Sequence, residues 1–360
     1  MSNPIQHIAV IRMSAMGDVA MTVPVIRAFV EQSRSVGTNV KITVVSRPFF
    51  KPFFNGIENV NFFAVDVKER HKGFPGLLRL YFDLKQLNID VVADLHNVLR
   101  SKIIRTLFAL SGKKVAHTDK GRADKKALTR AEKKALKPIK TMIERHVETF
   151  KKLGFNIDLS NPTFPQKAIL DDEIETISGE KENKKWIGIA PFAQYESKSY
   201  PQDLMQKVID ELASDRNNKI FLFGGGKKEI ETLNSFAKGK KNVINVAGKL
   251  QLQQELDLIS NLDVMLSMDS GNAHIAAMLG IKVVTLWGAT HPFAGFAPFN
   301  QPLENCLISD REKFPKLPTS VYGNKKVKGY EEAMRSIPVE TILEKIRAKT
   351  ASPKEARPLR

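Results

Sequence analysis

The sequence predicts an α/β protein built from two halves, each containing a parallel sheet. In both halves, short apolar segments alternate with segments whose apolar residues recur at helical spacing. Strands that alternate with helices form parallel sheets covered on both faces, because crossovers join them. A chain of 360 residues also exceeds one comfortable hydrophobic core, so two domains are expected. The polar segment 156–185, which contains Pro162 and Pro165, is the expected linker.

The expected strands are apolar and rich in β-branched residues. In the first half they are residues 7–12, 40–46, 60–67 and 91–96, and in the second half 186–191, 219–223, 243–246, 264–268 and 283–287. The expected helices are residues 19–31, 77–87, 100–110, 140–153, 202–212, 227–236, 252–259, 272–279 and 338–348. The segment 119–138, mostly Lys, Arg and Ala, fits either an exposed helix or a loop.

These elements group into an N-terminal domain over residues 1–165 and a C-terminal domain over residues 166–337. A last helix and a tail with frayed end residues are expected over 338–360. Both large domains restart the same strand–helix alternation, without a close sequence repeat.

Composition bounds the class of protein. An apolar fraction of 42% excludes global disorder, and the single cysteine, Cys306, cannot form an intrachain disulfide. There is no signal-peptide pattern and no apolar run approaching the roughly 20 residues that span a bilayer. We therefore expect a cytoplasmic protein.

The positive charge is concentrated in one region. The formal net charge is +17, and residues 100–152 hold 17 Lys/Arg against 5 Asp/Glu, a local difference of +12. This region is either a solvated basic surface or a contact for an anionic acceptor, a membrane surface or nucleic acid. No zinc-finger spacing or RNA-binding signature is present, so nucleic acid is not an expected partner.

The turn after the first expected strand offers a catalytic candidate. Gly17 allows a sharp bend, and Asp18 follows at the carboxyl end of the strand, the edge that faces the ligand in open α/β sheets. Asp18 suits a general base, but it can also simply cap a helix. Pro24 favours a helix capped at Thr22 instead, since Pro is tolerated only in the first helical turn.

The second half carries an anion-binding candidate after the strand at 264–268. Small residues at Asp269, Ser270 and Gly271 would expose backbone N–H groups where a helix begins, and phosphate binds at such positions. His274 lies in the first turns of that helix, and Lys198 could supply a cation. The structural alternatives are a packed histidine and an ordinary surface lysine.

A second glycine turn follows the strand at 219–223. Gly225 lies in a run of three glycines that lets a ligand approach the backbone, and Glu229 could accept hydrogen bonds from ribose hydroxyls. A solvated Glu at a helix start is the alternative.

Several other site types are not predicted. The dinucleotide fingerprint GxGxxG is missing after the first strand, which argues against an NAD enzyme. No Asp-x-Asp, no metal-ligand spacing of His, Cys and carboxylates, and no Gly-x-Ser-x-Gly elbow occur. No metal is expected to be required.

Together these pieces resemble the glycosyltransferase family 9 heptosyltransferases, which use ADP-heptose to build lipopolysaccharide. Four segments carry the likeness in family order. The first three are Arg-Met-Ser-Ala-Met-Gly-Asp-Val at 12–19, Asp-Leu-His-Asn-Val-Leu-Arg-Ser at 94–101 and Glu-Arg-His-Val-Glu at 144–148. The fourth is Asp-Ser-Gly-Asn-Ala-His-Ile-Ala-Ala-Met-Leu-Gly at 269–280, followed by Leu-Trp-Gly-Ala-Thr at 286–290. Departures are Ser270 in place of Thr, His96-Asn97 in place of Gln-Gly, and the Lys-rich stretch 113–140.

The resemblance implies a GT-B fold, with two Rossmann-like domains facing across a cleft. It implies inverting, metal-independent transfer from an ADP-sugar, bound as substrate in the C-terminal domain with no cofactor, to a lipid A core acceptor in the N-terminal domain. From the local charge of +12 we expect the basic region 100–152 to meet this anionic glycolipid acceptor in peripheral contact with the inner membrane. Asp18 matches the catalytic aspartate and Lys198 the phosphate-binding lysine. The donor loop corresponds to Asp269, Ser270, Gly271 and His274, and acceptor positions to Arg100 and His146.

Two alternatives remain open at this point. One is another enzyme of nucleotide sugars, either a GT-B glycosyltransferase that uses a different donor or a nucleotide-sugar epimerase. The other is a non-catalytic binding protein that keeps the fold and uses its basic face.

Overall fold

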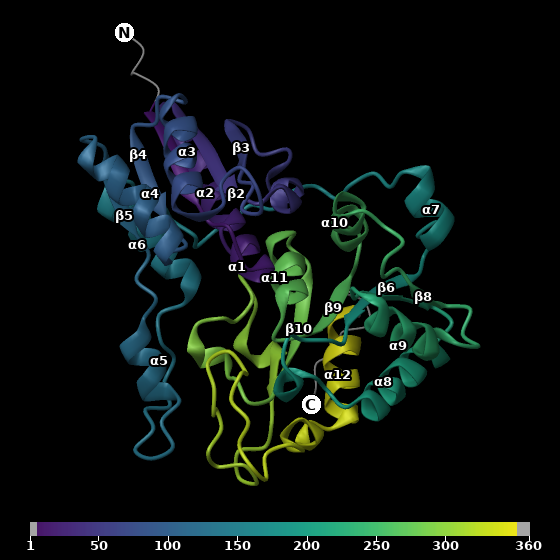
Figure 1. Cartoon of the computed structure of the whole chain (residues 1–360). Helices are drawn as coiled ribbons and strands as arrows, with labels where there is room; N and C mark the ends of the chain where they lie inside the picture. The colour runs from purple at the N-terminus through teal and green to yellow at the C-terminus, as the bar shows by residue number, and fades with distance from the viewer. Residues whose placement is uncertain (1–5, 351–360) are drawn as a thin grey trace. The chain divides into compact units, whose positions relative to one another are not determined.

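The computed structural model describes residues 6–350 and divides the chain into two compact units. The first unit contains the chain to Gly121 together with Lys140–Phe164, and the second contains Arg122–Ile139 and the chain from Pro165 onward. The expected tail residues 351–360 lie outside the described residues. The predicted α/β class with two parallel sheets is confirmed (Figure 1).

The sheet of the first unit has five parallel strands in the order β3-β2-β1-β4-β5. The strands are β1 Gln6–Ile11, β2 Val40–Ser46, β3 Val60–Ala64, β4 Val91–Asp94 and β5 Lys114–His117. The helices are α1 Met16–Ala20, α2 Val23–Ser35, α3 Gly73–Lys85, α4 Leu99–Leu110 and α6 Met142–Leu153, with a 3-10 helix, η1, at Pro48–Phe54. In the core, Ala9 and Ile11 of β1 meet Leu80 of α3 and Ile104 of α4.

The sheet of the second unit has six parallel strands in the order β11-β10-β9-β6-β7-β8. The strands are β6 Lys185–Ala190, β7 Asn218–Leu222, β8 Val243–Asn245, β9 Val264–Met268, β10 Lys282–Trp287 and β11 Cys306–Ile308. The helices are α5 Arg122–Leu128, α7 Asp172–Ser178, α8 Gln202–Ser214, α9 Lys227–Ala237, α10 Leu252–Ser260, α11 Gly271–Met278 and α12 Val339–Thr350. Short 3-10 helices are η2 Glu196–Lys198, η3 Pro292–Ala294, η4 Leu303–Asn305 and η5 Ala333–Ser336.

Local sequence explains where the first helices begin and end. The helix expected over 19–31 is two helices, because α1 ends at Ala20 and α2 begins after the cap residue Thr22 with Pro24 in its first turn. This is the break that Pro24 predicts. In α6 the hydroxyl of Thr141 accepts from the Glu144 N–H while the Glu144 carboxylate accepts from the Thr141 N–H, and Gly154 closes the helix at φ 100°.

Among the strands and α-helices of the described residues, two strands and one helix were not predicted. Strands β5 and β11 are only four and three residues long, too short for a periodic signal. Helix α7 lies within the segment expected to be a linker, where the carboxylate of Asp171 accepts from the Ile174 N–H and starts the helix.

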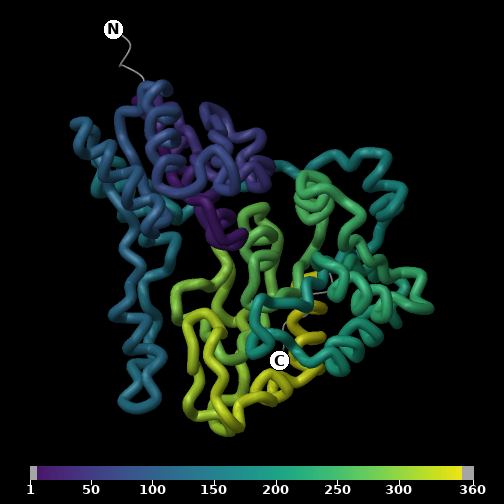
Figure 2. Tube along the Cα trace, viewed as in Figure 1, coloured from purple at the N-terminus to yellow at the C-terminus, as the bar shows by residue number. Residues whose placement is uncertain are grey.

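The Lys-rich segment 122–139 differs from the expected domain assignment, which placed it within 1–165. It packs in the second unit: Lys125 is 5% exposed with its Nζ 4.3 Å from the Phe296 ring centroid, and the Ile139 N–H donates to Phe293 O at 3.1 Å. Figure 2 shows the segment as a narrow excursion out and back along the chain. A lysine side chain such as that of Lys125 can be buried because its aliphatic stem packs against apolar residues and its ammonium lies against an aromatic ring. The number of charges in the segment therefore does not predict how exposed it is.

Candidate functional site

Asp18 of the first unit is held by a buried arginine. Its Oδ1 lies 2.6 Å from Nη2 of Arg12, and its Oδ2 accepts from the Ala15 N–H at 3.2 Å. The Arg12 side chain is 6% exposed and also donates to the carbonyls of Ser14 at 2.8 Å and Leu95 at 2.7 Å. The Asp18 side chain is 28% exposed. The arginine is therefore fixed by the ends of β1 and β4, and the carboxylate is the accessible member of the pair.

The structure is compatible with both interpretations of Asp18, the helix cap and the general base. The carboxylate reaches back to the residue that precedes α1, as a helix-starting Asp does, and it also lies at the carboxyl edge of the sheet. Whether it takes a proton from an acceptor remains a prediction.

His96 lies beside this ion pair, and residue chemistry alone did not select it. The carboxylate of Asp94 accepts from the His96 and Asn97 N–H groups and fixes the turn after β4. His96 Nε2 lies 3.4 Å from Ser14 Oγ. Burial, followed by the charge of Arg12, lowers the pKa of His96 to about 3, so the imidazole is neutral near pH 7.

The two predicted acceptor residues have different surroundings. Arg100 lies at the start of α4, half-buried, at the same sheet edge as Asp18, and forms no ion pair within residues 6–350. His146 on α6 is fully buried, and its Nδ1 lies 3.1 Å from the hydroxyl of Thr118. The described contact of His146 is therefore internal to the first unit, and its acceptor role remains a prediction.

In the second unit, the structure brings Lys198 and Asp269 together. Lys198 Nζ lies 3.0 Å from Asp269 Oδ2, and the two side chains are 12% and 9% exposed. Lys198 ends η2, which follows β6, while Asp269 directly follows β9. Because β6 and β9 are neighbours in the sheet, residues 71 positions apart meet at one edge.

The loop that carries Lys198 is held by close backbone contacts. The Ala289 N–H donates to Ser197 O at 3.0 Å, and the Ser197 hydroxyl donates to Gly323 O at 2.6 Å. A Cβ on Gly288 would lie 2.3 Å from Ser197 O, and one on Gly323 would lie 2.4 Å from Cδ of Lys198. A side chain at position 288 would clash with the backbone of Ser197, and one at position 323 with the Lys198 side chain, so the two glycines leave room for this loop and its lysine.

The start of α11 carries the features on which the predicted anion site rests, and anion binding there remains a prediction. Ser270 is the cap residue, its hydroxyl lies 3.0 Å from that of Ser267, and the helix begins at Gly271. The first N–H groups of a helix have no partner within the helix, and those of α11 directly follow Asp269, the partner of Lys198, in the sequence. His274 is buried in the next positions of α11.

The glycine turn after β7 is closed by Glu229. The Glu229 carboxylate accepts from the Gly225 N–H at 2.8 Å and sits in the first turn of α9. The side chain of Glu229 therefore stabilises the turn in this structure, and its role toward a ribose remains a prediction.

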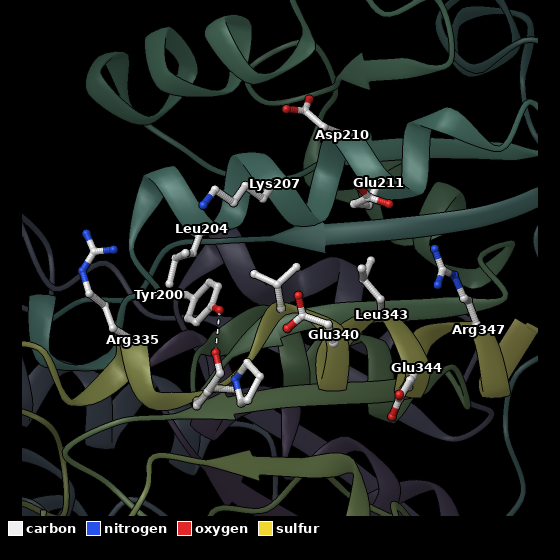
Figure 3. Close-up of a pocket in the computed structure, with 13 residues that line it drawn as sticks. Tyr200, Leu204, Lys207, Asp210, Glu211, Arg335, Glu340, Leu343, Glu344 and Arg347 are labelled. Atoms are coloured by element: carbon white, nitrogen blue, oxygen red, sulfur yellow. Dashed lines mark hydrogen bonds between the residues drawn. The ribbon is translucent and has the colours of Figure 1, made fainter. Parts of the chain in front are cut away.

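A groove of about 790 Å³ lies elsewhere, between α8 and α12 (Figure 3). Tyr200 lines it and donates to Ile337 O at 2.7 Å, and charged residues of both signs stand along its sides. None of the predicted site residues lines this groove. It is therefore not part of the candidate site.

Two kinds of feature are absent from the described part of the chain. Within residues 6–350 no group of three or more His, Cys, Asp and Glu side chains is placed to hold a metal ion. No helix in the same range combines the length and apolar character that crossing a membrane takes.

Comparison with protein families gives a match over most of the chain. The family described as Glycosyltransferase family 9 (heptosyltransferase) matches residues 77–326. The lipopolysaccharide core heptosyltransferase OpsX of Haemophilus influenzae is 23% identical over 94% of this chain and 95% of its own length. Lipopolysaccharide heptosyltransferase 1 of Campylobacter coli is 25% identical over 79% of this chain and 84% of its own.

Solved structures support the same fold. The glycosyl transferase family 9 structure from Veillonella parvula has a TM-score of 0.72 at 18% identity, covering 96% of this chain and 97% of that one. The E. coli heptosyltransferase WaaC with ADP has a TM-score of 0.66 at 18% identity, covering 96% and 100%. The predicted GT-B fold class is thereby confirmed.

Proposed function

The chain belongs to glycosyltransferase family 9 (heptosyltransferase), and on that premise we propose that it transfers heptose from ADP-heptose to a lipopolysaccharide core acceptor. It is an enzyme of glycosyl transfer, and the proposal concerns its donor, its acceptor and its chemistry. The observation that supports the proposal most directly is Asp18, an accessible carboxylate that Arg12 fixes at the carboxyl edge of the first sheet.

The proposed reaction is a single inverting displacement. An acceptor hydroxyl oxygen attacks the anomeric carbon of the heptose, and Asp18 takes the hydroxyl proton. The bond between the anomeric carbon and the diphosphate oxygen breaks on the opposite face, and ADP leaves. One bond forms, one breaks, and the sugar configuration inverts.

The second unit supplies the groups proposed to hold the diphosphate. A helix N-terminus contributes only about 0.3–1 kcal/mol toward an anion at an exposed site, too little for a departing diphosphate. Lys198 lies at the same sheet edge as the first N–H groups of α11 and adds a full charge. In this proposal His274 and Glu229 complete the donor site.

Transfer is proposed to proceed without a metal and at the cytoplasmic face of the inner membrane, where Arg100, His146 and the basic residues 100–152 meet the anionic acceptor. A chelator such as EDTA should leave the transfer rate unchanged within about twofold. A loss of activity that added Mg²⁺ restores would contradict this part.

The decisive experiment combines binding and turnover with purified protein. In a thermal-shift panel, ADP should stabilise the protein more than UDP, GDP and NAD, since ligand bound to the folded state raises its stability. Incubation with ADP-heptose and a heptose-deficient lipopolysaccharide should release ADP and add one heptose. Preference for UDP would identify a different nucleotide-sugar donor, and tight RNA binding without nucleotide affinity would identify a binding protein.

A further inference from the structure

We propose that the carboxyl edge of the first sheet is a docking surface for an anionic lipid bilayer, with Phe49, Phe74 and Leu99 entering the headgroup layer. The inference rests on the proposed function, because it assigns a place to the lipid that carries the acceptor. It names a surface other than the basic stretch 100–152 as the apolar anchor.

The first observation is a repeated exposure of large apolar side chains. Phe49 in η1 follows β2 and is 58% exposed, Phe74 at the start of α3 follows β3 and is 61% exposed, and Leu99 at the start of α4 follows β4 and is 76% exposed. The carboxyl ends of parallel strands share one edge of the sheet, so these side chains project from the same edge. Single exposed apolar residues need no explanation, but one after each of three strands at one edge does.

Short-range contacts place Phe74 at this edge in spite of the longer connection after β3. The His71 ring lies 6.1 Å from the Phe63 ring near the end of β3, and the Asp66 N–H donates to His71 Nδ1 at 3.0 Å. The connection is thus folded against the strand end, and α3 begins two residues later.

The second observation is the charge beside each apolar side chain. Arg47 and Lys51 flank Phe49, and Lys72 precedes Phe74. Leu99 is followed by Arg100 and Lys102. None of these five cations forms an ion pair within the described residues. Apolar side chains among unpaired cations are the pattern of proteins that lie on anionic membranes.

The opposite edge of the same sheet shows that exposure alone is not the signal. Val36 after α2 is 75% exposed and Leu110 at the end of α4 is 80% exposed. There, however, the neighbouring cations are neutralised: Arg34 pairs with Glu58 at 2.7 Å, and Lys113 lies 3.8 Å from Asp90. The cation nearest to each of these two apolar residues in sequence is therefore paired, and the two residues provide matched controls.

The proposed docking loops lie on either side of Asp18. Strand β1, which leads to Asp18, lies between β2 and β4 in the sheet. The loops with Phe49 and Leu99 therefore stand on either side of the candidate base. A bilayer held by these loops would present a membrane-anchored sugar at the edge where Asp18 is accessible.

Vesicle sedimentation with the full chain tests the proposal. The protein should bind vesicles of phosphatidylglycerol and phosphatidylethanolamine and not vesicles of phosphatidylcholine. The triple variant Phe49→Ser/Phe74→Ser/Leu99→Ser should lose about tenfold or more in partitioning, while Val36→Ser/Leu110→Ser should stay within about twofold of the parent. Equal loss in both variants, or binding indifferent to lipid charge, would overturn the proposal.

A second readout does not depend on the triple variant being stable. In Phe49→Trp the fluorescence should shift to shorter wavelength when anionic vesicles are added, and in Leu110→Trp it should not, because only the first indole leaves water. Trp186 and Trp287 are buried and supply a constant background. Matching shifts in both single variants, or none in either, would contradict the assignment.

The failure of this surface and the failure of the proposed function are distinguishable. If the surface is right, the triple variant should keep the thermal shift with ADP and transfer to a water-soluble, deacylated acceptor, and lose transfer only to acceptor in vesicles. If the parent protein binds no ADP, the proposed function fails, while the tryptophan shift still decides the surface.

Discussion

In both units an aspartate and a cation form an ion pair where a central strand of the sheet ends, but the two pairs differ in which partner is fixed. In the first unit, Arg12 is 6% exposed and bound to two carbonyls, and Asp18 is 28% exposed. In the second, Lys198 and Asp269 are 12% and 9% exposed, and the lysine ends a flexible stem.

The difference in chemistry follows from the residue types. A guanidinium binds several acceptors in a fixed fork, so Arg12 holds Asp18 in one orientation. An ammonium is a single charge that can exchange one anion for another, so Lys198 can pass from Asp269 to a diphosphate. In the proposed mechanism the first pair presents a base, and the second supplies a cation for the donor diphosphate.

Replacing Asp18 with Asn should have the largest effect on activity. Asn keeps the size and a hydrogen-bond acceptor but cannot take the proton, so kcat should fall by about 10³-fold. ADP affinity, measured by calorimetry, should stay within about twofold, since the proposed donor site is in the other unit. The control is Asp90→Asn at the opposite sheet edge, which should keep full activity. Transfer at the parent rate in the Asp18 variant would remove the proposed base.

Replacing Lys198 with Met should break the second pair. The affinity for ADP should fall by about 10²-fold, as one charge-assisted contact is lost. The free energy of unfolding should also fall, by about 3 kcal/mol, because Asp269 is left buried without its cation.

A second substitution separates these two effects. Adding Asp269→Asn to the Lys198 variant should recover much of the stability in urea unfolding, yet not the affinity for ADP. Recovery of both would mean that the lysine only balances Asp269.

The free energy of unfolding should depend on pH through the buried imidazole of His96, which lies beside the Arg12–Asp18 pair. The pKa of His96 is lowered to about 3, while an unfolded chain titrates near 6.5. Below pH 6.5 the unfolded state therefore binds a proton that the folded state does not, and stability falls as the pH falls toward 3.

The expected size is about 2 kcal/mol lost at pH 5 relative to pH 8 from this one group. His96→Gln cannot titrate and should reduce the fall in unfolding free energy between pH 8 and pH 5 by that amount. Urea titrations across the range measure it. An unchanged slope would show that His96 is accessible to protons in the folded state.

The smallest effect is expected for Arg12→Lys. Lysine keeps the charge near Asp18 but cannot also hold the carbonyls of Ser14 and Leu95, so the carboxylate loses its fixed orientation. We expect kcat to fall by about tenfold with ADP affinity unchanged. A change as large as that of Asp18→Asn would give Arg12 a more direct part than positioning.

The sequence allowed prediction of those site features that depend on local chemistry. Small residues after an apolar strand located the turns at Asp18 and Ser270, and Pro24 located the break before α2. It did not allow prediction of the partners. Lys198 meets Asp269 only because β6 lies beside β9, and strand order is not encoded within either segment.

The burial of Arg12 could not be predicted from the sequence either. An arginine at the end of an apolar strand usually reaches solvent. Here it is buried because two carbonyls and a carboxylate satisfy its donors at once. A buried cation can be recognised only when all of its acceptors are in place.

The placement of residues 122–139 in the second unit has a practical consequence for dissecting the protein. The chain passes from one unit to the other after Gly121, after Ile139 and again after Phe164, so a single cut near 164 does not yield two complete modules. The C-terminal fragment would lack the segment that covers Phe296 and supplies the fully buried Leu128. Fragments produced separately should be poorly soluble, and co-expression of the two pieces should restore assembly by complementation.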